Sequence, residues 1–402
     1  MTAQIFDAAV IGGGPAGSKT AAMIAEKGHR VLLLEKRNRI GHPVRCAEAV
    51  GPYEDVRRFI SLDDSIVSST VNGIVVVSPD GTRFEASTPE IGYVVDRELF
   101  DLRLAETASQ AGARVRTGHQ AVELLKRGGS VAGLIVKDLE TGDHYEVDAH
   151  VVVGADGVEG LSTRWAGLAG PLRPDEVMSC AQELMSGIDL SDSHIEFHLG
   201  RKFAPGGYAW VFPKGVDRAN VGVGINPRES DGRSALEYLN RFIEHRCPAG
   251  ERNRLVIGAS SVASGLPKLA TDGYLAVGEA ARQNNPFSGG GIINALEGAE
   301  MASGVILKAL DRGEYSSRLL NEYSKKWNRT VGRSNRAYYH AARIFYSLDE
   351  GEMNRAMSRL GRTPGLIDET GVRPAKIIRI LASLYPSLAL KLVKSLVRDK
   401  KT

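Results

Sequence analysis

Residues 5–35 read IFDAAVIGGGPAGSKTAAMIAEKGHRVLLLE, and this stretch decides the fold. The apolar run at 5–11 is typical of a buried strand, and a G-x-G-x-x-G pattern follows it at 12–17. Small residues at 18–27 predict a helix, and a second apolar strand at 31–34 ends on an acid. Strand, glycine turn, helix, strand and acid in this order indicate a βαβ unit that binds a dinucleotide.

Four residues of this unit have separate physical roles. Gly12 allows the tight turn, Gly14 lets the backbone approach a pyrophosphate, and Gly17 lets helix and strand pack closely. The helix N-terminus faces the anion. Glu35 ends the second strand and is placed to bind ribose hydroxyls, which favours NAD or FAD over NADP.

Two further glycine segments resemble a flavoprotein family. Residues 151–157 (VVVGADG) form an apolar strand that ends in glycines, and residues 273–281 (GYLAVGEAA) lead through 285–292 (NPFSGGGI) into a helix. With the N-terminal unit, these segments resemble the para-hydroxybenzoate-hydroxylase-like flavoproteins, whose glycine sites hold FAD. Residues 96–101 (DRELFD) are similar to the family's helix start with a flavin-contacting arginine. The implied fold class is α/β, with a Rossmann-like FAD-binding domain assembled from discontinuous segments, a β-sheet substrate domain and a helical C-terminal region.

The resemblance implies FAD as the cofactor, with one departure. Where the family usually has Gly-Asp-Ala, this chain has glutamate at Glu279, which can still accept hydrogen bonds from ribityl hydroxyls. A helix beginning at 289–292 would direct its N–H groups at the flavin and stabilise the reduced, anionic form. Besides the four residues above, the expected FAD contacts are Ala16, Arg45, Cys46, Ala47, Ala49, Arg97, Ala121, Asp156, Glu279, Gly290, Gly291 and Ile292.

Two motifs resemble the geranylgeranyl reductase family more narrowly. Residues 43–49 (PVRCAEA) look like its cysteine-bearing loop, and residues 205–213 (PGGYAWVFP) match its P-x-x-Y-x-W-x-F-P motif. On a strand, Tyr208, Trp210 and Phe212 share one face. Periodicity alone favours core packing for this stripe, whereas the resemblance favours the wall of a cavity for a polyprenyl chain.

Cys46 is the candidate catalytic residue. A lone cysteine is usually an inert buried side chain, but Arg45 and His42 lie close in sequence and are expected to lower its pKa. The thiol would then act as a proton donor or as a redox partner of the flavin. The resemblance places this loop beside the isoalloxazine ring. Cys180 and Cys247 have no such context and are interpreted as structural, and no metal site is indicated.

The resemblance implies an FAD-dependent reductase that saturates C=C bonds of geranylgeranyl chains by hydride transfer from reduced flavin, similar to archaeal enzymes acting on digeranylgeranylglycerophospholipid. The alternatives are a flavin-dependent monooxygenase of the same fold, or a non-catalytic protein for lipid binding or electron transfer. No second nucleotide motif is present, so the electrons come from an external reductant, either NAD(P)H or a ferredoxin-like protein. The net charge of +3 argues against a nucleic-acid partner.

The 402 residues suffice for two domains and a helical end. The expected FAD-binding domain comprises 1–70, 94–165 and 258–335, the substrate domain 71–93 and 166–257, and the helical region 336–402.

Residues 375–402 carry seven Lys and Arg against one Asp among many apolar residues. This tail predicts either peripheral binding to the inner face of a membrane or a solvated helix face. The predicted location is cytoplasmic.

Overall fold

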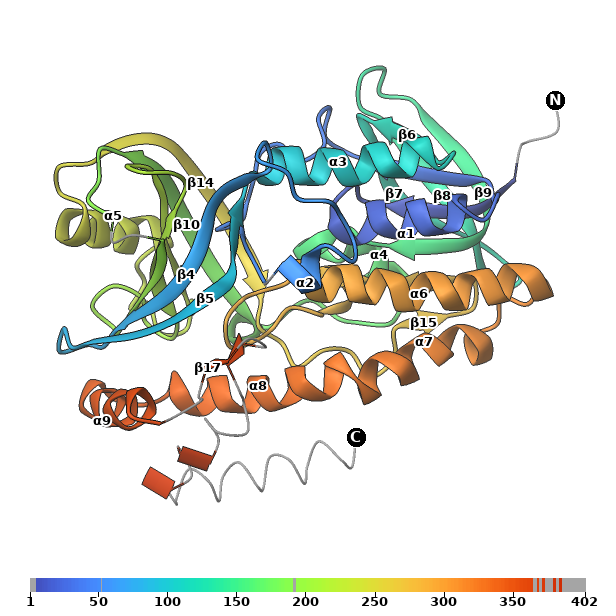
Figure 1. Cartoon of the computed structure of the whole chain (residues 1–402). Coiled ribbons are helices and arrows are strands. Elements are labelled where there is room, and N and C mark those ends of the chain that lie inside the picture. The colour runs from blue at the N-terminus through green and yellow to red at the C-terminus, as the bar shows by residue number, and fades with distance from the viewer. Residues whose placement is uncertain are drawn as a thin grey trace.

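The computed structural model describes residues 5–51, 53–190 and 193–363, with the short segments 367–368, 371–372, 379–380 and 383–384. Most of the basic tail at 375–402 therefore lies outside the described residues. Two large sheets lie side by side, and helices cover the first of them and continue beneath the second (Figure 1). Among the described residues, no helix combines the length and apolar character needed to cross a membrane.

The first sheet is the nucleotide-binding sheet, with strand order β15-β16-β9-β1-β2-β6 and a β7-β8 hairpin attached to β9. Its strands are β1 (Phe6–Ile11), β2 (Val31–Glu35), β6 (Arg114–Thr117), β7 (His119–Arg127), β8 (Ser130–Asp138), β9 (His144–Gly154), β15 (Ala270–Thr271) and β16 (Tyr274–Ala276). β1 runs parallel to both β2 and β9. In the register of these pairs, Ala8 lies opposite Val31 of β2 and Val151 of β9. Each neighbour is thus separated from β1 by a crossover, as a βαβ unit requires.

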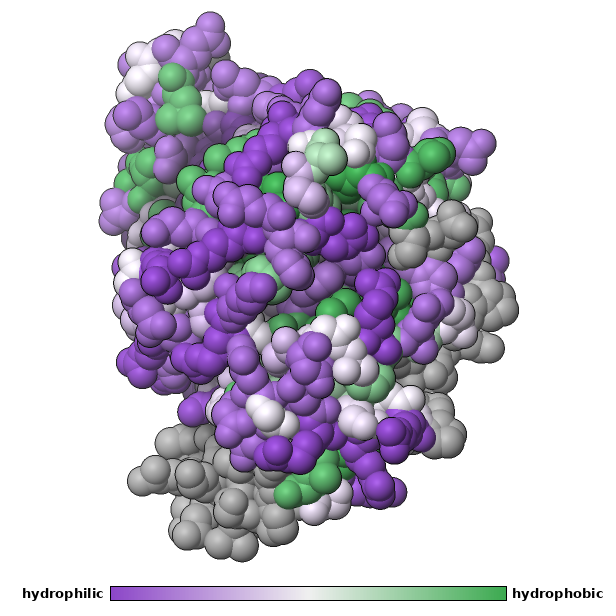
Figure 2. All heavy atoms as spheres, turned by 90° about the vertical axis from the view of Figure 1, so that its left-hand side faces the viewer, coloured by the Kyte–Doolittle hydropathy of each residue, from purple (hydrophilic) through white to green (hydrophobic). Residues whose placement is uncertain are grey.

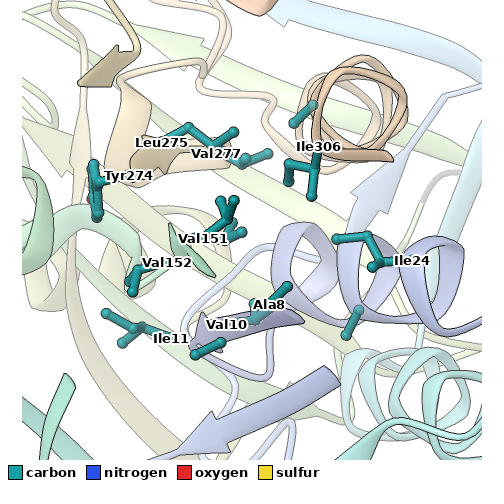
Figure 3. Packing of buried hydrophobic residues seen from close by; sticks show 14 of the residues in the cluster. Ala8, Val10, Ile11, Ile24, Val151, Val152, Tyr274, Leu275, Val277 and Ile306 are labelled. Atoms are coloured by element: carbon teal, nitrogen blue, oxygen red, sulfur yellow. The ribbon is translucent and has the colours of Figure 1, made fainter. Parts of the chain in front are cut away.

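Helices α1 (Pro15–Ala25), α3 (Arg97–Gln110) and α6 (Ile292–Arg312) pack beside this sheet (Figure 1). Figure 3 shows Ile24 of α1 and Ile306 of α6 facing the apolar side chains of β1, β9 and β16. Helix α1 begins at Pro15, three residues earlier than predicted, because proline is favoured at the first helical position and Gly14 serves as the N-cap. The glycine turn therefore leads directly into the helix.

The second sheet has the order β14-β10-β13-β12-β11-β4-β5-β3. Its strands are β3 (Ala49–Val50), β4 (Val67–Val77), β5 (Arg83–Val95), β10 (Val177–Ser186), β11 (His194–Leu199), β12 (Tyr208–Pro213), β13 (Ala219–Ile225) and β14 (Glu251–Ser261). Helix α5 (Ala235–Arg246), which the strand-rich pattern did not predict, covers one face. Its Leu239 and Phe242 are fully buried against Ala209 and Val211 of β12. The other face of β12 is left for the aromatic residues.

Helices α7 (Ser317–Arg329), α8 (Val331–Phe345) and α9 (Glu350–Gly361) follow α6, and α8 extends from the first sheet to the region beneath the second (Figure 1). Two short helices, α2 (Tyr53–Val56) and α4 (Leu161–Trp165), lie between the larger elements along the chain. The end of the molecule seen in Figure 2 is mainly hydrophilic, with apolar side chains in small separate groups. The predicted fold class is confirmed: an α/β FAD-binding fold with a second sheet and a helical C-terminal region.

Candidate active site

A cavity of about 800 Å³ extends between the two sheets and is also lined by α3, α6 and α8. The sequence-predicted residues that line it are Gly12, Gly14, Ala16, Glu35, Arg45, Cys46, Ala47, Ala49, Arg97, Ala121, Asp156, Tyr208, Trp210, Phe212, Glu279, Gly290, Gly291 and Ile292. Gly17 is the exception. A Cβ on Gly17 would lie 1.9 Å from the carbonyl oxygen of Gly12, so this glycine allows close packing, as predicted for it.

The dinucleotide end of the cavity is formed by the turn between β1 and α1. Gly12 has φ of +103°, a conformation that favours glycine, and Gly14 is the N-cap of α1. A Cβ on Gly14 would have no atom within 4 Å, so space remains where a pyrophosphate would approach. Glu35 is held by N–H donors from Gly13 and Arg37, each at 2.9 Å, which fixes its carboxylate at the cavity edge. These residues fit an ADP-containing cofactor.

Two acids further along the cavity are already engaged by protein donors. Asp156 accepts hydrogen bonds from the N–H and the hydroxyl of Ser162, at 2.9 and 2.7 Å, and so holds the start of α4. Glu279 directs one oxygen, Oε1, to Ser261 N–H at 2.9 Å and Asn284 Nδ2 at 2.6 Å. Burial raises the pKa of Glu279. Among the described residues, the hydrogen bonds to Glu279 all go to Oε1, so Oε2 is open to a donor from a ligand.

The environment of Cys46 differs from the expectation. Burial raises the pKa of the Cys46 thiol, and the main opposing influence is the positive charge of Arg97. The prediction that Arg45 and His42 lower this pKa is wrong, because His42 instead contacts Glu98 at 3.1 Å and Arg45 is exposed. Arg97 itself forms a bidentate pair with Asp101, with both distances 2.8 Å. A protonated Cys46 can donate a proton but is a poor thiolate nucleophile.

Glu48, two residues after Cys46, forms a buried ion pair that the sequence did not reveal. Its side chain is 1% exposed, and its backbone has φ of +73°, which is unfavourable for a non-glycine residue. The carboxylate accepts hydrogen bonds from Lys214 Nζ at 2.7 Å and Asn220 Nδ2 at 2.5 Å, and from the N–H of Arg97 at 3.0 Å. Lys214 directly follows the P-x-x-Y-x-W-x-F-P motif, and Asn220 lies on β13. Glu48 thus joins the cysteine loop to the second sheet and to the start of α3.

The backbone of the cysteine loop is held from the same sheet. Gln182 donates to the carbonyl of Cys46 at 3.0 Å, and Asn220 donates to the carbonyl of Ala47 at 3.2 Å. Trp210 in turn donates its indole N–H to Gln182 at 3.1 Å. One amide side chain therefore connects the aromatic strand to Cys46. Neither Gln182 nor Asn220 carries a sequence signal that would have identified this role.

The three aromatic residues of β12 line the cavity together. The ring centroids of Tyr208 and Trp210 are 5.9 Å apart, and those of Trp210 and Phe212 are 6.4 Å apart. Phe197 of β11 adds a fourth ring, 5.2 Å from Tyr208. Trp210 is 7% exposed and packs over Gly222, where an added Cβ would lie 2.2 Å from the indole ring. The rings form a continuous apolar wall that also belongs to a packed cluster.

The resemblance implies that a prenyl chain lies against this wall, so replacing Trp210 with alanine is expected to lower turnover on C20 prenyl substrates more than on C10 ones, since the lost contact area lies along the prenyl chain. The free energy of unfolding should fall by less than the ~3–5 kcal/mol of an emptied core site, because one side of the ring faces the cavity. Denaturant melts and paired turnover assays measure both effects. Phe242→Leu, in the core under α5, is the control and should affect only the melt. A severe melt defect in Trp210→Ala without a change in chain-length preference would place this residue in the core.

The fold and the cavity together define a flavoprotein with an FAD-binding domain. A family model described as FAD binding domain matches residues 6–193, and one described as Geranylgeranyl reductase catalytic domain matches residues 176–262. The chain belongs to the geranylgeranyl reductase family, which confirms the predicted family and FAD as the cofactor.

Curated and solved relatives cover almost the whole chain. A digeranylgeranylglycerophospholipid reductase of Methanocella arvoryzae is 38% identical, covering 96% of this chain and 98% of the relative. The enzyme of that name from Methanosarcina acetivorans is 42% identical over 82% of each chain. The crystal structure of a geranylgeranyl bacteriochlorophyll reductase-like protein from Thermoplasma acidophilum superposes with a TM-score of 0.88, at 31% identity over 97% of this chain and 99% of that one.

Proposed function

We propose that this protein reduces C=C double bonds in the geranylgeranyl chains of isoprenoid lipids of the archaeal type. The observation that carries the proposal is one cavity whose lining includes the dinucleotide turn, the aromatic wall of β12 and Cys46. Family membership supports the same reaction. Bound FAD, once reduced, supplies the hydride.

The chain's own residues supply position and a proton. An isolated alkene has no carbonyl to polarise, so catalysis depends on holding the chain in place and excluding water. Tyr208, Trp210 and Phe212 provide the apolar wall against which a prenyl chain lies. Cys46 holds a proton at Sγ, since its pKa is raised, and we assign it the protonation of the second alkene carbon. The lining residues given above other than these three aromatic ones, with Gly12, Gly14, Glu35 and Arg97 foremost, are the proposed FAD contacts, and Gly17 supports the turn that holds them.

The domain division and the partners follow from this assignment. We propose 1–70, 94–165 and 258–335 as the FAD-binding domain, 71–93 and 166–257 as the substrate domain, and 336–402 as the helical region. The substrate is a membrane lipid, so we propose peripheral association with the inner face of the membrane. The reductant is NAD(P)H or a ferredoxin-like protein.

Anaerobic mixing of the dithionite-reduced holoprotein with geranylgeranyl lipids tests the function. We expect mass spectrometry to find lipids that have gained pairs of hydrogen atoms. Oxygen consumption coupled to NAD(P)H oxidation, with an oxygenated product, would instead indicate a monooxygenase. FAD and lipid binding without any product would indicate a binding or electron-transfer protein.

Replacing Cys46 with serine should leave FAD bound but slow single-turnover alkene reduction by at least about 100-fold, the usual lower range for loss of a positioned acid. The hydroxyl keeps the shape of the thiol but holds its proton more tightly. Cys180→Ser is the matched control: Cys180 also lines the cavity, and burial raises its pKa to about 12. Equal rates in Cys46→Ser and the wild type would return Cys46 to a structural role.

A further inference from the structure

Arg343 lies at the part of the cavity formed by the helical C-terminal region. Helix α8 and the residues just after it contribute Tyr339, Ala342, Arg343, Tyr346 and Ser347 to the lining. Arg343 is exposed, and its Nη1 donates to the hydroxyl of Tyr339 at 2.9 Å. Its guanidinium carbon also lies 5.6 Å from the centroid of the Tyr339 ring. One face of the guanidinium is thus fixed by tyrosine while N–H donors remain for a ligand.

Among the residues that the structure describes, no carboxylate pairs with Arg343. Two of the acids that line the same cavity are paired with other cations: Glu229 with Arg201 at 3.0 Å and Asp175 with Arg173 at 3.2 Å. Over the part of the chain that the structure describes, no carboxylate lies within 4 Å of Arg343. An anion brought by a ligand would therefore meet an uncompensated cation.

The stretch of sequence around Arg343 is rich in cations and lacks acids. Residues 323–348 contain no Asp or Glu and six cations: Lys325, Lys326, Arg329, Arg333, Arg336 and Arg343. Arg336 lies seven residues before Arg343 on α8, about 10 Å along the axis at 1.5 Å per residue, which is the screening length at 0.1 M salt, and the other four cations are farther along the chain. Of these six, Arg343 is the one that lines the cavity.

Aromatic residues of the same cavity lining lie between Arg343 and the aromatic wall in a chain of contacts. Tyr346, one turn after Ala342, donates its hydroxyl to the carbonyl of Phe287 at 3.0 Å, and the two ring centroids are 5.8 Å apart. Tyr208, the first residue of the aromatic wall, donates to the carbonyl of the adjacent Ser288. Aromatic side chains therefore continue from α8 to β12. A ligand with an anionic group at one end and a long apolar chain matches this arrangement.

We propose that Arg343, oriented by Tyr339, binds the phosphate of a phosphorylated isoprenoid and so fixes which end of the prenyl chain faces α8. The inference rests on the proposed function, since it assigns the headgroup end of the same substrate site. Arginine suits this role because its planar donors bind phosphate in a bidentate manner, which lysine cannot reproduce. The phosphate belongs either to a glycerophospholipid headgroup or to a free prenyl diphosphate.

Binding to the oxidised holoprotein tests the proposal apart from turnover. The ligands are geranylgeranyl diphosphate, a digeranylgeranyl glycerophospholipid and the uncharged geranylgeraniol, each measured at low and high salt. Arg343→Gln should weaken binding of at least one phosphorylated ligand by about tenfold or more, with geranylgeraniol unchanged. Arg343→Lys should lie between the wild type and Arg343→Gln, and Tyr339→Phe should show a smaller loss. Arg333→Gln, on the same helix but outside the cavity lining, is the control.

The pattern of loss identifies the source of the phosphate. A loss confined to the phospholipid indicates the headgroup, and a loss confined to the diphosphate indicates the free prenyl ester. The proposal would be overturned if Arg343→Gln weakened binding of all three ligands equally. It would also be overturned if this variant bound both phosphorylated ligands as tightly as the wild type does. The proposed function fails separately, if the reduced wild type binds these lipids and reduces none of them.

Discussion

Replacing Gly14 with valine is expected to remove FAD from the protein while leaving the fold intact. Gly14 has φ of −76°, which any residue adopts, and an added Cβ would meet no protein atom within 4 Å. The side chain would project into the cavity instead, at the point where a pyrophosphate approaches the start of α1. Overpacking costs about 1–3 kcal/mol or more, so FAD affinity should fall by at least about 10- to 100-fold.

Flavin content after purification and the thermal melt of the apoprotein separate the two effects. Gly14→Val should purify without the yellow colour of the wild type yet melt close to the wild-type apoprotein. Gly17→Ala is the matched comparison, because its Cβ would lie 1.9 Å from the Gly12 carbonyl oxygen and force α1 away from β1. That variant should lose stability as well as FAD. Full FAD occupancy in Gly14→Val would refute the position of the pyrophosphate.

The features that could be predicted from the sequence depend on short separations along the chain. The βαβ unit is complete within residues 5–35, so its strand, turn and helix each leave a local pattern. The aromatic stripe of β12 likewise follows from the period of two in one strand. Helix α5 was missed because it lies between strands in a region whose overall pattern is strand-rich.

The contacts that could not be predicted join distant parts of the chain. Glu48 and Lys214 are 166 residues apart, and nothing in either segment indicates the other as its partner. The pKa of Cys46 was misjudged for the same reason. Arg45, the neighbour in sequence, is exposed and does not act on the thiol, whereas the charge of Arg97 acts on it from α3. Helix periodicity indicated the helices after residue 292 but not that α8 lines the cavity.

Replacing Lys214 with methionine is expected to destabilise the protein strongly and to displace Cys46. Lys214 has a side chain 9% exposed, and that of Glu48 is 1% exposed, so the variant leaves a buried carboxylate without its counter-ion. Such a loss typically costs about 3–5 kcal/mol. We expect a loss of unfolding free energy near the lower end of this range, because Asn220 and the N–H of Arg97 continue to donate to Glu48.

Denaturant melts of a double-mutant cycle measure this pair. Glu48→Gln with Lys214→Met removes both charges while an amide still accepts from Asn220 and Arg97, so the double variant should be more stable than Lys214→Met alone. Lys308→Met is the matched control: Lys308 and Glu322 are also 2.7 Å apart but exposed, and such pairs contribute little.

The functional consequence of losing Lys214 follows from the geometry of the cysteine loop. Glu48 keeps its unfavourable φ of +73° because Lys214, Asn220 and Arg97 hold its side chain, and its N–H donates to Cys46 Sγ at 3.2 Å. Without Lys214 the loop should relax, so Cys46 should react faster with a neutral thiol reagent and alkene reduction should slow while FAD stays bound. A variant as stable as Lys308→Met, with unchanged thiol reactivity, would show that the loop holds its conformation without the ion pair. Positioning of the proton donor would then depend on Gln182 and Asn220, which hold the carbonyls of Cys46 and Ala47 from the second sheet.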